Sequence, residues 1–152
     1  MSKKRFMSLL FCAVLALSCL SCTVSAANTS DSIYTYTWNS NSRIDYTNAR
    51  KKQNATKVYI HAVENTLPYN GFYASTYYGT GLYTATNKAS ASEYKINSYG
   101  HFVIRPNGTS VNQSGKYVRI RGHYTDTKYS WGDAQIAWSP DTAPQSGLIN
   151  LN

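Results

Sequence analysis

Alternation of apolar and polar residues with a period of two is the feature that most constrains how this chain can fold. Residues 117–124 show it most regularly, with Val118 and Ile120 at one set of positions and Arg119 and Arg121 between them. Successive side chains of a β-strand point to opposite faces of the sheet, so this pattern predicts a strand with one face in the core. No stretch repeats convincingly with the period of about 3.6 residues that an amphipathic helix needs.

Other segments rich in Val, Ile, Thr, Tyr, Phe and Trp also favour strands. The predicted strands are residues 33–38, 56–63, 72–78, 82–86, 94–96, 101–105, 117–125 and 132–138. Turn-forming residues separate them, as at Asn70 and Gly71, in 106–108 and in 48–54. This arrangement predicts an all-β domain, an antiparallel β-sandwich or partly open barrel of about seven or eight short strands. The alternation places eight side chains in its core: Val58, Ile60, Phe102, Ile104, Val118, Ile120, Ile136 and Trp138.

The N-terminal residues 1–26 have the layout of a secretory signal peptide. A cationic start at residues 3–5 precedes an apolar run over 7–20, and small residues follow. The run is shorter than the roughly 20 apolar residues of a spanning helix, which favours cleavage after Ala26 or Ala27 and an extracellular protein. Two alternatives stay open, an uncleaved anchor and a lipoprotein lipidated at Cys22.

The remaining chain is expected to form one domain over residues 27–142, followed by a C-terminal tail over 143–152. The two prolines of residues 139–144 cannot continue a central strand, so the tail either frays or docks its apolar residues onto the body. All three cysteines lie in the leader, so the domain holds no disulfide, thiol nucleophile or cysteine-rich metal site.

The net charge of the domain is moderately positive. Without the leader the chain keeps 12 of its 15 Lys and Arg residues and all 7 acidic residues, which gives +5. Such an excess of positive charge favours binding to anionic surfaces, and it is equally compatible with a role in ordinary solubility.

The polar face of the 117–125 strand is the candidate ligand-binding site. It carries Tyr117, Arg119, Arg121 and His123 in a row. Guanidinium groups bind carboxylates and phosphates bidentately, and tyrosine offers a ring and a hydroxyl, so the row suits an anionic or sugar ligand. The simpler interpretation is that these side chains only cover the solvated face of a half-buried strand.

A second, accessory basic cluster precedes the 56–63 strand. It consists of Arg50, Lys51, Lys52 and Lys57. Basic residues at a strand start often only discourage edge pairing, so this cluster gains weight as a recognition site if the fold brings it beside Arg119 and Arg121.

Catalytic and metal-binding patterns are weak. His61, His101 and His123 fall on three different predicted strands, so no local metal-ligand spacing exists. The chain has no nucleophile elbow, zinc-protease motif or phosphate-binding glycine loop, and no pair of carboxylates stands out. We therefore expect no enzyme activity, no catalytic or metal-ligating residues and no cofactor.

The layout of the chain resembles known secreted proteins. A cationic leader, a cysteine-free body rich in Tyr, Thr and Asn, and a last strand running Ala-Gln-Ile-Ala-Trp-Ser-Pro-Asp over residues 134–141 are similar to small, largely uncharacterised secreted proteins of Gram-positive bacteria. The similarity to bacteriocins of the lactococcin 972 type is looser. That resemblance implies a cysteine-free β-sandwich acting at the cell envelope, and it carries no catalytic residue over to this chain.

The sequence thus predicts a secreted, non-enzymatic protein of a Gram-positive bacterium. It would bind an anionic cell-envelope polymer, a lipid head group or a carbohydrate through its basic and aromatic strand faces, with no specific nucleic-acid partner and no membrane span. The alternatives are a bacteriocin-like toxin acting on the envelope and a small secreted hydrolase that uses histidine with aspartate or glutamate.

Overall fold

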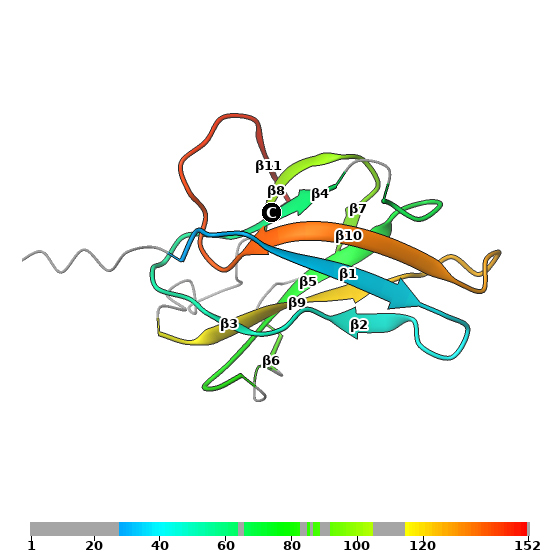
Figure 1. Ribbon diagram of the computed structural model, residues 1–152, viewed down its shortest axis with the longest axis horizontal. Coiled ribbons are helices and arrows are strands. Elements are labelled where there is room, and N and C mark those ends of the chain that lie inside the picture. The colour runs from blue at the N-terminus through cyan, green and yellow to red at the C-terminus, as the bar shows by residue number, and fades with distance from the viewer. Residues whose placement is uncertain are drawn as a thin grey trace, which may run out of the picture.

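Two β-sheets make up the described part of the protein. The computed structural model describes residues 28–63, 66–82, 85, 87–88, 92–104 and 115–151 (Figure 1), and all regular secondary structure in these ranges is β. The predicted all-β sandwich is therefore confirmed, and the sheets do not close into a barrel. The described residues include no helix long and apolar enough to cross a lipid bilayer.

The first sheet has five strands in the order β1-β10-β4-β8-β11. Its members are β1 (Ser32–Trp38), β10 (Gly132–Ser139), β4 (Val58–Ala62), β8 (Gly100–Ile104) and β11 (Leu148–Asn150). Neighbours are antiparallel except β11, which runs parallel to β8. The C-terminal tail thus docks onto the body, and the loop before β11 arches away from it (Figure 1).

The second sheet is organised around β9 (Tyr117–His123). One edge of β9 pairs with β5 (Phe72–Gly79), and the other edge pairs with two short strands, β2 (Ile44–Tyr46) and β3 (Arg50–Lys51). The far edge of β5 pairs with β6 (Asn87–Lys88) and β7 (Tyr94–Ile96). All of these pairs are antiparallel.

Aromatic side chains hold the two sheets together. The Tyr36 hydroxyl and the Trp38 indole N–H of β1 donate to the backbone carbonyls of Ile120 and Gly122 on β9, each across 3.3 Å. A Cβ atom at Gly122 would lie 2.8 Å from both rings, so only glycine fits there. The sandwich is thus joined by aromatic packing and by hydrogen bonds from one sheet to the backbone of the other.

The predicted core is confirmed in full. The eight side chains that alternation placed inward are all buried, and Tyr36, Trp38, Phe72, Ile96 and Tyr124 join them. The burial of β9 alternates at every residue, with Val118, Ile120 and Gly122 inward. Because successive side chains of a strand point to opposite faces, a regular alternation of apolar and polar residues determines which of them face the core.

Several predictions lie partly or wholly outside the described residues. The signal peptide and its cleavage site belong to this group, as do the turn at 106–108 and most of the strand predicted over 82–86. Asn70 and Gly71, by contrast, both have positive φ, 64° and 69°, as expected for a turn. Strands β2, β3, β6 and β11 are not among the predicted strands.

Candidate functional site

The predicted basic row lies on the outer face of β9, which points away from the other sheet. Tyr117, Arg119, Arg121 and His123 are each half-buried there, between inward-facing neighbours. Their positions agree with the predicted phase of the strand.

Two members of the row are bound to one carboxylate. Arg121 forms an ion pair with Glu93, and His123 Nδ1 lies 3.0 Å from the other Glu93 oxygen. Burial and the neighbouring Arg121 lower the pKa of His123. The Arg121 side chain is 12% exposed, so the protein itself already satisfies much of its charge.

Arg119 is held differently. Its Nε donates to the backbone carbonyl of Ala85 across 2.7 Å, and its guanidinium carbon lies 4.0 Å from the centre of the Tyr46 ring. It also lines a cavity of about 340 Å³. Arg119 is thus fixed in place without an acidic partner among the described residues.

The accessory cluster does not gather into one basic surface. Lys52 is fully buried, and its Nζ lies 2.8 Å from Asp141 Oδ1 and 2.6 Å from the Pro140 carbonyl oxygen. Burial lowers the pKa of Lys52. Burial alone would raise the pKa of Asp141, but hydrogen bonds from Lys52 and from the backbone N–H groups of Gln53 and Asn28 lower it overall. Lys52 therefore belongs to the interior and is unavailable to a ligand.

The other three members of the cluster point in different directions. Arg50 pairs with Val118, which faces inward on β9, and donates to the Trp138 carbonyl across 3.0 Å. Lys57 donates to Asn150 Oδ1 across 2.7 Å. Only Lys51, exposed and paired with Tyr117, joins the outer face that carries the basic row.

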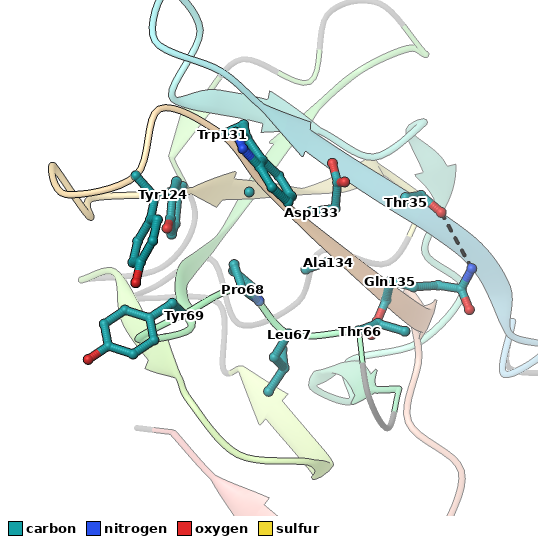
Figure 2. Close-up of a pocket in the computed structure, with 12 residues that line it drawn as sticks. Thr35, Thr66, Leu67, Pro68, Tyr69, Tyr124, Trp131, Asp133, Ala134 and Gln135 are labelled. Carbon is teal, nitrogen blue, oxygen red and sulfur yellow. Dashed lines mark hydrogen bonds between the residues drawn. The ribbon is translucent and has the colours of Figure 1, made fainter.

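A second site, which the sequence did not indicate, is an aromatic pocket of about 540 Å³. Three of its side chains are exposed aromatics: Trp131 is 68% exposed, Tyr69 60% and Tyr129 37%. Figure 2 shows Tyr69 and Tyr124 at one end of the pocket and Thr35 and Gln135 at the other. Its lining comprises Thr35, Thr66, Leu67, Pro68, Tyr69, Tyr124, Tyr129, Trp131, Gly132, Asp133, Ala134 and Gln135.

Strand β10 supplies one side of this aromatic pocket. Trp131 directly precedes the strand, and Asp133 and Gln135 alternate with buried residues along it. Gln135 lies opposite Thr35 of β1 and donates to its hydroxyl across 3.5 Å. These polar side chains therefore stand in a row beside the indole, on the outer face of the first sheet.

Gly132 lets the opposite side of the pocket approach β10. A Cβ atom at this position would lie 3.0 Å from the ring of Tyr124 and 3.2 Å from Pro68. Contacts this short are tighter than almost all found in proteins, so a larger residue would push Tyr124 or Pro68 away. The shape of the pocket thus depends on a glycine.

The charge of the aromatic pocket is nearly balanced. Asp133 is the only charged side chain among the described residues that line it. At the rim, the Lys128 ammonium lies 5.4 Å from the ring centre of Tyr129 and 5.7 Å from that of Tyr69. The pocket therefore presents flat apolar faces together with a few hydrogen-bonding groups, rather than a strong field of one sign.

The remaining histidines meet on the outer face of the first sheet. His61 of β4 pairs with His101 of β8, and their rings stack 4.3 Å apart between centres. The Tyr59 hydroxyl lies 2.5 Å from His101 Nδ1. Burial and the neighbouring His101 lower the pKa of His61. No group of three possible metal ligands occurs among the described residues.

Comparison with known protein families identifies a match. The model of DUF2712, described as a protein family of unknown function, matches residues 22–142. The chain belongs to the DUF2712 family. No curated protein and no solved structure matches it. The matched range of DUF2712 contains every residue that lines the aromatic pocket and all of β9, and it ends before β11.

Proposed function

We propose that this member of DUF2712 is a secreted, non-enzymatic protein that binds a carbohydrate component of the cell envelope in its aromatic pocket. The observation that carries the proposal is the exposure of Trp131, Tyr69 and Tyr129 around one cavity. Exposed apolar groups that are gathered rather than scattered are typical of interaction sites.

The chemistry of the aromatic pocket suits a sugar. A pyranose ring has an apolar face of C–H groups and a rim of hydroxyls, so it needs both a flat apolar surface and nearby hydrogen-bonding groups. Trp131 provides the surface, the Asp133 carboxylate accepts hydrogen bonds from hydroxyls, and the Gln135 amide can donate and accept. A cavity of about 540 Å³ lies within the range of small-molecule sites.

The charge of the pocket favours a neutral sugar over an anionic polymer. A carboxylate or phosphate placed against Asp133 would meet a like charge. The basic row on β9 favours an anionic partner in the sequence alone, but Arg121 and His123 of that row share Glu93. The carbohydrate hypothesis therefore rests on the aromatic pocket and not on the basic row.

The proposed extracellular location rests on the N-terminal sequence. Its cationic start and apolar run have the pattern of a leader, and the envelope polysaccharides of a Gram-positive bacterium are accessible to a secreted protein. A toxin of the bacteriocin type and a small hydrolase remain the alternatives, and each differs from simple binding in an outcome that can be measured.

Co-sedimentation with purified cell-wall polysaccharide tests the proposal. The secreted wild-type chain should pellet with the polymer, and Trp131→Ala should raise the apparent Kd by about tenfold or more, a typical effect of losing a central aromatic contact. Tyr99→Ala is the matched control, because Tyr99 is 49% exposed and does not line the pocket. We expect this control to bind within about twofold of the wild type, since most interface truncations have small effects.

Three other outcomes would contradict the proposal. Equal binding by the Trp131 and Tyr99 variants would separate the polymer from the pocket. Release of reducing ends from the polysaccharide would show a hydrolase. Growth inhibition of sensitive cells without polysaccharide binding would favour the bacteriocin-like alternative.

A further inference from the structure

We infer that Arg119 forms a second binding site, for the carboxylate or phosphate group of a small organic anion, in the cavity beside β2. This cavity lies on the outer face of the second sheet, whereas the aromatic pocket lies on the first. The inference is therefore independent of the proposed carbohydrate site.

The guanidinium group of Arg119 is already oriented. Its Nε donates to the Ala85 carbonyl across 2.7 Å, and its plane is supported by the Tyr46 ring, 4.0 Å away. Tyr46 is itself held by an edge contact with Tyr77, with ring centres 5.6 Å apart. A long side chain fixed in this way loses little conformational entropy when a ligand binds, which favours affinity.

The two terminal nitrogens of Arg119 remain for a ligand. No described residue accepts a hydrogen bond from them, in contrast to Arg121, which is bound to Glu93. A guanidinium that presents two parallel N–H groups matches two oxygens of one carboxylate or phosphate. The geometry of the site therefore fits bidentate recognition.

The surroundings of this cavity favour a negative ligand with an apolar portion. Within the part of the chain that the structure describes, Arg119 is the only charged side chain that lines it. Asn48 adds an exposed amide at the rim, and Leu82, 50% exposed, adds an apolar wall. Since the cavity measures about 340 Å³, it accommodates a small organic anion such as a sugar acid or sugar phosphate.

Titration of the full secreted chain with glucuronate, glucose 6-phosphate and glucose, followed by two-dimensional NMR, tests the site. We expect the Arg119 Nε–H signal to shift with at least one of the anions and not with glucose. The anion that binds more tightly identifies whether the natural group is a carboxylate or a phosphate. Binding of glucose as tight as that of both anions would overturn the inference.

Two variants at Arg119 and one control separate recognition from general attraction. Arg119→Gln should weaken binding by about tenfold or more, because charge-assisted hydrogen bonds are lost. The affinity of Arg119→Lys should lie between those of Arg119→Gln and the wild type, since lysine keeps the charge without the bidentate geometry. Lys51→Gln removes the same charge from an exposed site on the same face and should leave the Kd within about twofold, because exposed charges contribute little.

Three results would contradict the assignment of the site to Arg119. The first is equal loss of binding by Arg119→Gln and Lys51→Gln, and the second is full binding by Arg119→Gln. The third is no shift of the Arg119 signal with either anion at low salt, where screening of charges is weakest. Thermal unfolding of each variant shows whether it has folded, and Arg119→Lys provides a second test should Arg119→Gln fail to fold.

Discussion

The basic row on β9 and the aromatic pocket beside β10 both face solvent, yet they differ in how far the protein itself already uses their functional groups. In the basic row, Arg121 and His123 share Glu93, and Arg119 is anchored to Ala85. In the aromatic pocket, Trp131 and Tyr69 are more than half exposed.

A charged residue and an aromatic residue on a surface therefore differ in how well they indicate a binding site. A charged residue that the sequence pattern places on the solvent face can be neutralised by an acidic residue from another segment. Glu93 neutralises Arg121 in this way. Trp131, by contrast, is 68% exposed, so most of its surface stays available to a ligand. Exposure after folding is therefore a better indicator of a binding site than residue type alone.

The largest expected effect concerns Lys52, the basic residue that the fold uses most fully. Lys52→Ala should lower the free energy of unfolding by about 3–5 kcal/mol, because it leaves the buried Asp141 carboxylate without its ion-pair partner. Lys51→Ala, at the neighbouring exposed position, should change it by less than about 0.5 kcal/mol. Urea unfolding of both variants provides the measurement. Similar stabilities for the two variants would show that Lys52 is not an interior residue.

A smaller effect on stability is expected at Glu93, whose carboxylate contacts Arg121 and His123 of the basic row. Glu93→Gln should destabilise the fold by about 1 kcal/mol or less, because the ion pair is partly exposed to solvent. It should also release Arg121 and strengthen retention on a dextran sulfate column, so that the variant elutes at higher salt than the wild type.

Asp31→Asn is the matched control for the Glu93 variant. It removes one negative charge from an exposed residue that does not contact the row, and its elution should move less than that of Glu93→Gln. If both variants elute alike, net charge alone determines retention, and Glu93 does not mask the row.

The sequence predicts the central strands and their core faces better than it predicts the edges. Alternation is unbroken in β9 and holds over the first five residues of β10, so the phases of both strands follow directly from the residue order. Strands β2 and β3 have three and two residues, too few for a pattern, and they form by pairing with β9. Strand β11 follows a proline-containing loop and pairs in parallel, which neighbouring residues do not specify.

The candidate sites depend on contacts between distant segments. In the sequence, Lys52 looks like one of the four cations of the accessory cluster, but its partner Asp141 lies 89 residues away. The aromatic pocket is assembled from Thr35 of β1, residues 66–69, the segment between β9 and β10, and strand β10 itself. Such arrangements depend on the topology of the sheets, so only the row on β9, which lies within one strand, could be derived from local sequence.

Indole spectroscopy gives the most direct test of the claim that the aromatic pocket binds carbohydrate. Among the three tryptophans, Trp38 and Trp138 are buried and only Trp131 is exposed. Oligosaccharides from the cell wall, titrated into the ¹⁵N-labelled secreted chain, should therefore shift the Trp131 indole N–H signal and leave those of Trp38 and Trp138 in place. A titration in which the oligosaccharide binds while the Trp131 signal stays unchanged would contradict the account.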